Sequence, residues 1–167
     1  RILLIHASRF SFHVTEKTSA VSSLAELADE QRQGSTGDVL VAFMASEKTD
    51  EKGIDSVAAQ AAETIAEQAK QVKTAAVMLY PYAHLSSNLA SPRVATKVLA
   101  RIGELMKDSG LEVHEAPFGF YKGFEIECKG HPLSELAKTI LPGGEGDASA
   151  RAAGEEDASA ALAAEKE

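Results

Sequence analysis

Two short stretches hold most of the side chains that are able to do chemistry. One is Tyr-Pro-Tyr-Ala-His-Leu-Ser-Ser at 80–87, and the other is Ala-Pro-Phe-Gly-Phe-Tyr-Lys-Gly-Phe at 116–124. The second continues into Glu-Cys-Lys-Gly-His-Pro-Leu-Ser-Glu at 127–135. Gly and Pro mark these stretches as turns that end strands, and loops on a rigid scaffold are where binding and catalytic groups are usually found. Binding and catalytic groups are therefore expected in these stretches.

Lys122 is the strongest candidate for a catalytic group. An isolated turn lysine is most often simply exposed, but this one has four aromatic neighbours in the sequence (Phe118, Phe120, Tyr121 and Phe124). We expect its stem to lie against these rings and its ammonium to point into a cleft, where a cation stabilises developing negative charge.

Two histidines are weaker candidates. His84 follows a predicted buried strand at an edge where ligand pockets form, although a histidine satisfied by local backbone is equally consistent with the sequence. His131 precedes Pro132, and the slightly favoured interpretation is that it opens a helix. Glu135 would then lie one turn further on the same side as His131.

A metal site is not indicated. Cys128 and His131 are separated by two residues, and His84 and His6 would have to complete a ligand set. The chain has no pair of cysteines and no His-x-x-x-His or His-Glu-x-x-His pattern. Alternation with Phe124 suggests that Cys128 faces inward and is structural, which also argues against a cysteine nucleophile.

Hydrophobic periodicity predicts the elements that must position these residues. Strands are expected at 2–6 and 10–15, joined as a hairpin, and at 39–45, 75–80, 111–116 and 124–128. Helices are expected at 54–72 and 91–110, with a weak one at 23–31 and a short last one at 133–140. For the second main helix, Ser91 suits the N-cap, Pro92 the first turn and Gly110 the C-terminal end. The expected fold is α/β or α+β, with mostly antiparallel sheet and two main helices.

Length and charge narrow the class of protein. A chain of 167 residues suits one domain, here 1–142, followed by an acidic Ala/Gly-rich linker or disordered tail at 143–167. The net charge of −8 excludes broad electrostatic wrapping of nucleic acid but leaves room for contact with one RNA end. The single Cys128, the lack of a membrane-spanning stretch and the lack of a signal peptide predict a cytoplasmic protein.

Over residues 1–142 the chain resembles the N-terminal editing domain of archaeal threonyl-tRNA synthetases. The resemblance rests on five motifs in order: Arg-Ile-Leu-Leu-Ile-His, Val-Leu-Val-Ala-Phe, Tyr-Pro-Tyr-Ala-His-Leu-Ser-Ser, Ala-Pro-Phe-Gly-Phe-Tyr-Lys and Cys-Lys-Gly-His-Pro-Leu-Ser-Glu. It implies a fold like that of D-aminoacyl-tRNA deacylases and a homodimer. It also implies hydrolysis of serine mistakenly attached to threonine tRNA, with no metal or cofactor.

The resemblance also implies roles for individual residues. Matches to the segment around the terminal adenosine and the ester are Pro81, Tyr82, Ala83 and His84. Matches to the aminoacyl pocket are Phe118, Tyr121 and Lys122, with Gly119 in the same motif, and Glu135 matches a carboxylate that supports the lysine.

The chain departs from the family at two places. His6-Ala7-Ser8-Arg9 replaces the common His-Ser-Asp, and Ser46 replaces an apolar pocket residue. Ser46 bears on which side chain is selected rather than on hydrolysis itself.

The implied activity has a physical reason. Serine and threonine differ by one methyl group, which is worth only ~1–3 kcal/mol of pocket discrimination, so a synthetase needs a second site. The resemblance further implies that the RNA's 2′-hydroxyl helps to position the water. Expected partners are the 3′ end of tRNA(Thr) carrying serine and the synthetase's catalytic and anticodon-binding domains, in cis or in trans. The alternatives are a D-aminoacyl-tRNA deacylase and a non-catalytic module for RNA-end binding or dimerisation.

Overall fold

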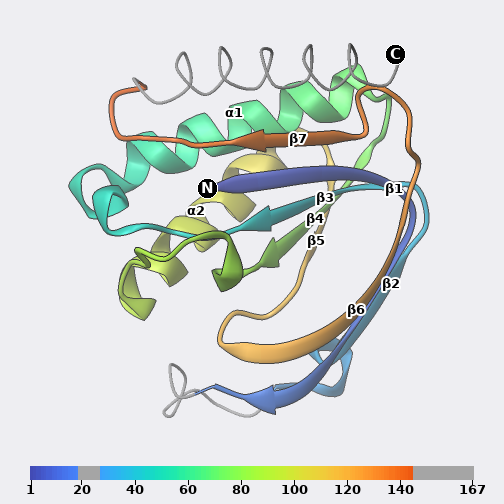
Figure 1. The fold of residues 1–167 in the computed structure, drawn as a ribbon, viewed down its shortest axis with the longest axis horizontal. Coiled ribbons are helices and arrows are strands. Elements are labelled where there is room, and N and C mark those ends of the chain that lie inside the picture. The colour runs from blue at the N-terminus through green and yellow to red at the C-terminus, as the bar shows by residue number, and fades with distance from the viewer. Residues whose placement is uncertain (19–26, 145–167) are drawn as a thin grey trace, which may run out of the picture.

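A computed structural model of the chain describes residues 1–18 and 27–144, which form a mixed sheet covered on one face by two helices (Figure 1). The strand order is β2-β1-β3-β4-β5, and β6 and β7 also pair with β1. Every partner of β1 is antiparallel, whereas the β3–β4 and β4–β5 pairs are parallel. The expected class, mixed with mostly antiparallel pairing and two main helices, is confirmed.

The long first strand differs from the expected hairpin. β1 runs without interruption over Ile2–Lys17. Its first half pairs with β3 (Val39–Met44) and β7 (Glu135–Lys138), and its second half pairs with β2 (Gln33–Thr36) and β6 (Phe120–Cys128). The segment between the two predicted strands has no Gly, Pro or Asn to make a tight turn. The strand instead continues through this segment, with a register shift between Ala7 and Arg9 in its pairing with β6.

Both main helices form where the apolar stripes predict them. α1 spans Ile54–Gln71 and α2 spans Pro92–Asp108. The hydroxyl of Ser91 accepts a hydrogen bond from the Val94 N–H at 3.4 Å, which confirms the predicted N-cap. At the other end Ser109 is the C-cap, and Gly110 follows with the positive φ of 87° that favours glycine there.

The helices connect parallel strands and set the edge at which the site lies. α1 joins β3 to β4 (Ala76–Pro81), and α2 joins β4 to β5 (Glu112–Glu115). One apolar core lies between the sheet and the helices, and a second, rich in aromatic rings, lies on the opposite face. The sheet curls, so that Phe10 of β1 and Phe124 of β6 reach Phe43 and Tyr80 of the parallel strands (Figure 1).

The last expected helix is a strand. β7 pairs with Ile2–Ile5 at the free edge of β1, and it alternates exposed and half-buried residues. Leu136 packs against the helix-side core from this strand. The prediction of a helix over 133–140 is therefore wrong, because pairing with β1 satisfies the backbone and buries Leu136 at the same time.

Other expectations fall partly outside the described residues. Of the weak helix at 23–31, only a short 3₁₀ turn at Asp29–Gln31 is described, and the chain from 145 onward lies beyond the described part. Gly143 and Gly144 are described as a turn in which the Gly143 N–H donates to Ser56 Oγ at 3.3 Å. In the two described ranges, no helix combines the length and the apolar character that a membrane crossing needs.

Candidate active site

Nearly all predicted site residues line one cavity of about 410 Å³. The nine that do so are Ser46, Pro81, Tyr82, Ala83, His84, Phe118, Gly119, Tyr121 and Lys122. The cavity lies where β3 and β4 end side by side, the edge of a parallel pair at which ligands commonly bind. The structure therefore brings together stretches that lie almost forty positions apart in the sequence.

Backbone hydrogen bonds join the segments that follow β3 and β4 beyond the sheet. The Tyr82 N–H donates to Met44 O at 2.7 Å, and the Ala90 N–H donates to Ser46 O at 2.9 Å. A 3₁₀ turn over Ala83–Leu85 then presents His84. The start of α2 closes one side of the cavity, and the start of β6 brings Lys122 to it.

Lys122 is held in place by two backbone carbonyls. It lies within β6, opposite Val14 of β1, rather than in the preceding turn as expected. Its Nζ donates to Pro117 O at 2.9 Å and to Phe120 O at 3.1 Å, and it lies 5.0 Å from the centre of the Tyr80 ring. An ammonium has three N–H donors, so one remains for a ligand.

Burial tunes this lysine toward neutral pH. Desolvation lowers the pKa of Lys122 to about 8. The group is therefore mostly charged at pH 7, and its charge acts where surrounding aromatic rings reduce the local dielectric. Such a cation is suited to stabilising an oxyanion that forms in the cavity.

The two other predicted catalytic residues of the cavity are placed differently. The His84 ring meets the Tyr82 ring edge-on at 5.1 Å between centroids. Tyr121 alternates with Lys122 along β6 and remains 57% exposed at the rim. His84 is thus the imidazole available at the cavity, whereas Tyr121 borders its opening.

Glu135 does not reach the cavity. It lies on β7 opposite Ile5, where its carboxylate is 3.4 Å from Cys128 Sγ. The expected support of Lys122 by Glu135 is not made within this chain, because the helix assumed for that segment is a strand on the other half of β1. The carbonyls of Pro117 and Phe120 hold the lysine instead.

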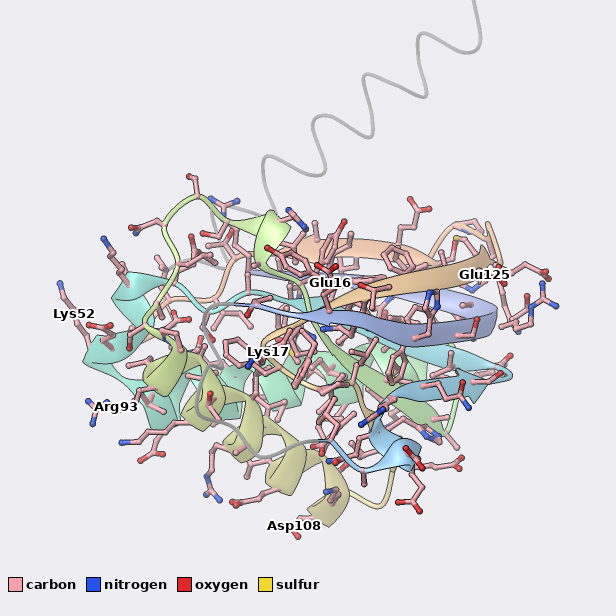
Figure 2. All side chains as sticks on the ribbon, turned by 90° about the horizontal axis from the view of Figure 1, so that it is seen from below. Glu16, Lys17, Lys52, Arg93, Asp108 and Glu125 are labelled. Carbon is pink, nitrogen blue, oxygen red and sulfur yellow. The ribbon has the colours of Figure 1, made fainter. Side chains whose placement is uncertain are left out.

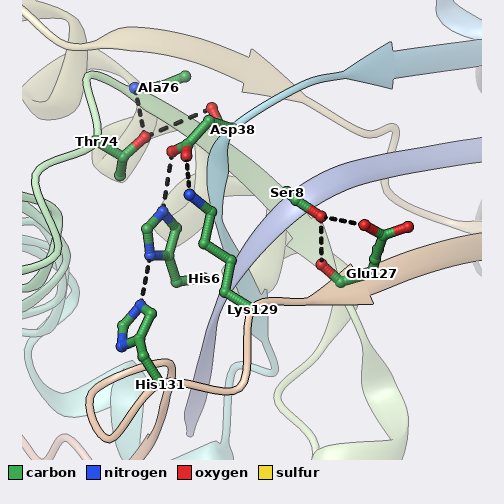
Figure 3. A network of polar contacts seen from close by, with 8 residues as sticks. All are labelled: His6, Ser8, Asp38, Thr74, Ala76, Glu127, Lys129 and His131. Carbon is green, nitrogen blue, oxygen red and sulfur yellow. Dashed lines mark hydrogen bonds and ion pairs between the residues drawn. The ribbon is translucent and has the colours of Figure 1, made fainter.

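A second polar cluster holds the segment after β6 on the start of β3 (Figure 3). His6, only 3% exposed, donates from Nε2 to Asp38 Oδ1 at 2.9 Å. His131 Nδ1 accepts from the Leu133 N–H at 3.1 Å, so its Nε2–H is the donor to His6 Nδ1 at 2.8 Å. Lys129 pairs with Asp38 as well. His131 therefore fixes this segment and opens no helix, contrary to the expectation from sequence.

The hydrogen bonds of this cluster favour the charged form of the Asp38 carboxyl group. Burial acts to raise the pKa of Asp38, but hydrogen bonds from Lys129 and His6 outweigh it and lower the pKa to about 2. The stabilisation is present above the ordinary carboxyl pKa of about 3.9. The stabilisation is lost as the pH falls toward 2, because Asp38 is then protonated in the folded chain as well as in the unfolded chain.

Cys128 differs from the expectation of an inward-facing side chain. It is exposed, with Sγ near Glu135 and 3.8 Å from Ser134 Oγ. Within residues 1–18 and 27–144, no group of three or more His, Cys, Asp or Glu side chains is arranged to hold a metal ion.

Sequence reasoning missed several residues of the cavity. Tyr80, buried in β4, lines it and supplies the ring under Lys122, and burial, followed by the charge of Tyr82, raises the pKa of Tyr80 to about 12. The first turns of α2 contribute Pro92, Ala95 and Leu99. The signal was present for Tyr80, which begins the 80–87 stretch, but nothing local shows that α2 borders the site.

Comparison with known proteins gives a consistent family. The family model described as the archaea-specific editing domain of threonyl-tRNA synthetase matches residues 1–140. The chain is 49% identical over 142 residues to a threonine–tRNA ligase of Pyrococcus furiosus, and these residues make up 85% of this chain and 22% of that protein. It is 47% identical over 142 residues to the ligase of Thermococcus gammatolerans, with the same shares, and 45% identical over 140 residues to that of Methanobrevibacter smithii, with shares of 84% and 22%. The chain thus spans about a fifth of the length of these curated relatives.

Proposed function

The chain belongs to the archaea-specific editing domains of threonyl-tRNA synthetases, which hydrolyse mischarged aminoacyl-tRNA, and from this premise we propose that its substrate is seryl-tRNA(Thr). The observation that carries the proposal is the Lys122 ammonium. It is partly buried at the cavity, held by two carbonyls and left with one N–H to donate.

The reaction needs little activation from the protein. In it, water adds to the ester carbonyl, the bond from the carbonyl carbon to the ribose oxygen breaks, and serine and the free RNA hydroxyl leave. Lys122 stabilises the oxyanion that forms on the carbonyl oxygen, as preorganised donors do in acyl transfer. The RNA's 2′-hydroxyl and the cavity backbone position the water, with His84 near the site of proton transfer.

Serine is distinguished from threonine by the shape of the cavity. In this proposal a wall formed by Phe118, Tyr121 and Ser46, all of which line the cavity, rejects the extra methyl of threonine in the reactive pose. A single methyl is worth only ~1–3 kcal/mol in binding, but steric rejection at a second site multiplies the discrimination of the first. Ser46 sets how tightly this wall fits.

The proposed setting is a larger synthetase acting in the cytoplasm. Catalytic and anticodon-binding domains, in cis or in trans, present the 3′ end of tRNA(Thr), and two copies of the domain associate as a homodimer. Tethering supplies a high effective concentration, so this acidic chain does not need strong affinity for RNA of its own.

Deacylation assays test the proposal directly. The protein is incubated with Ser-tRNA(Thr), Thr-tRNA(Thr) and a D-aminoacyl-tRNA, with and without a chelator. We expect release of serine alone at a rate that the chelator does not change. Release of D-residues would point to the deacylase alternative, no release to a binding module, and a rate abolished by chelator and restored by zinc to a metal enzyme.

A further inference from the structure

We propose that the exposed face of α2 that carries Arg93 and Lys97, with the groove beside it, binds the single-stranded RNA just before its terminal nucleotide. This inference rests on the proposed function, because it extends the same site along the RNA. The first three turns of α2 hold Arg93, Lys97 and Arg101 and no acid, in a chain of net charge −8.

The three cations form one stripe. They follow each other at four-residue intervals, so they lie on the same face of the helix, and all are exposed. Arg101 pairs with Glu104 at 3.1 Å, but neither the Arg93 nor the Lys97 side chain has a hydrogen bond or ion pair with any residue of 1–18 or 27–144. Figure 2 shows Arg93 and Asp108 near opposite ends of α2. The residues of α2 that line the catalytic cavity are Pro92, Ala95 and Leu99, so the cavity lies at the end of the helix that carries Arg93.

A groove joins this face to the catalytic cavity. It has a volume of about 270 Å³ and shares Pro81, Leu99 and Phe118 with the lining of the cavity. Thr96 and Ala100 form its wall on α2, and each is a neighbour of Arg93 or Lys97 at three-residue spacing. An RNA whose last nucleotide occupies the cavity would leave through this groove with its phosphates beside the stripe.

The one acid in the groove is partly compensated. Glu115 lines it from the end of β5, and Lys107 of α2 lies 3.9 Å from that carboxylate. The nearby ammonium therefore reduces, without removing, the repulsion of a phosphate by Glu115.

Arg93 is also placed against the preference of its own helix. It lies in the first turn, where the helix dipole favours acids, and this turn contains none. A residue that breaks a local rule without stabilising the fold is expected where function requires it. Removing Arg93 should therefore leave the melting temperature unchanged or raise it.

The test compares a double variant, Arg93→Gln with Lys97→Gln, on two substrates. One is a seryl minihelix RNA with a single-stranded 3′ end, and the other is the seryl ester of adenosine alone. We expect kcat/KM on the minihelix to fall about tenfold at low salt, mainly through KM, and to stay unchanged on the small ester. The slope of log affinity against log salt should flatten by about 1.4, at 0.7 for each single-strand phosphate contact.

Two further variants control for the loss of a positive charge elsewhere and test the groove. Lys70→Gln removes an exposed lysine from α1 and should leave kcat/KM unchanged on both substrates. Ala100→Phe fills the groove from an exposed helical position and should impair the minihelix but not the ester.

Binding of minihelix RNA that carries no amino acid, measured by fluorescence anisotropy, tests the RNA contact independently of hydrolysis. If the wild type binds this RNA but hydrolyses neither ester, the proposed reaction fails while the RNA contact stands. Unchanged binding and an unchanged salt slope in the double variant overturn the inference. Equal losses on both substrates also overturn it, because α2 would then act through the shape of the cavity.

Discussion

At the scale of single residues, the proposed chemistry depends on the charge of Lys122. Lys122→Met keeps most of the apolar stem and removes the charge, so the protein should fold. We expect single-turnover deacylation of Ser-tRNA(Thr) to slow by ~10²–10³, about 2.7–4 kcal/mol, as for loss of one oxyanion donor. Binding should weaken much less if the charge acts mainly in the transition state.

His131→Ala is the matched comparison for Lys122→Met. His131 belongs to the polar cluster at the opposite end of β3, so its loss should affect stability and leave the rate per folded molecule nearly unchanged. Near-normal deacylation by a folded Lys122→Met protein would remove the lysine from the mechanism. Positioning of the water by the backbone and the RNA would then have to explain the rate of deacylation without Lys122.

The pH profile shows which form of Lys122 acts. Because its pKa is about 8, the ammonium is lost above that value, and the enzyme-dependent rate should fall about tenfold for each further pH unit. Stability should move in the opposite direction. Between pH 8 and about 10.4 the unfolded lysine keeps a proton that the folded one has released, so the free energy of unfolding rises with pH.

Rates measured from pH 6 to 10, after subtraction of uncatalysed ester hydrolysis, check this expectation. Lys122→Met should lack both effects. An enzyme-dependent rate that increases through pH 8 would instead assign the neutral amine as a general base.

At the scale of elements, the polar cluster around His6 attaches the segment 129–134 to the sheet. His6→Phe keeps the apolar body and leaves the donor of His131 and the acceptor of Asp38 without their partner. We expect the free energy of unfolding to fall by about 0.5–1.5 kcal/mol for each lost hydrogen bond, because Asp38 is half exposed, keeps Lys129 as a partner and can bind water in place of His6. Urea denaturation measures this change.

The rate per folded molecule should not change in His6→Phe, because the cluster lies at the start of β3 and the cavity at its end. A large loss of activity in a fully folded His6→Phe protein would show that the two ends of the strand are coupled.

Elements whose signal is local were predictable, and those that depend on a distant partner were not. α2 was found from its stripe, Ser91 and Gly110, and β3 from its continuous apolar run. β7 was mistaken for a helix because nothing in its own residues shows that the edge of β1 is free. That one error also misplaced Glu135, whereas the meeting of 80–84 with 118–122 followed correctly from strand ends and family motifs.

At the scale of the whole molecule, the site uses a small local charge within an acidic chain. The negative charge is concentrated at the C-terminal end, where residues 145–167 hold seven acids and two bases. Their net charge is −5, so the rest of the chain carries −8 − (−5) = −3. Long-range repulsion of RNA phosphates is therefore expected from this end more than from the domain itself.

Deletion of residues 145–167 tests this division. They contain one large apolar residue, Leu162, whereas the preceding turn is tied to the domain by Ser56 and is retained in the shortened chain. We expect the melting temperature to change by no more than about 2 °C, because a stretch with so little to bury contributes little stability. Deacylation of seryl minihelix should rise at low salt and converge with the full chain at high salt, since screening removes the repulsion. The seryl ester of adenosine, which has no phosphate, should be hydrolysed equally by both proteins. A marked loss of melting temperature would show instead that this segment packs on the domain or on a second copy.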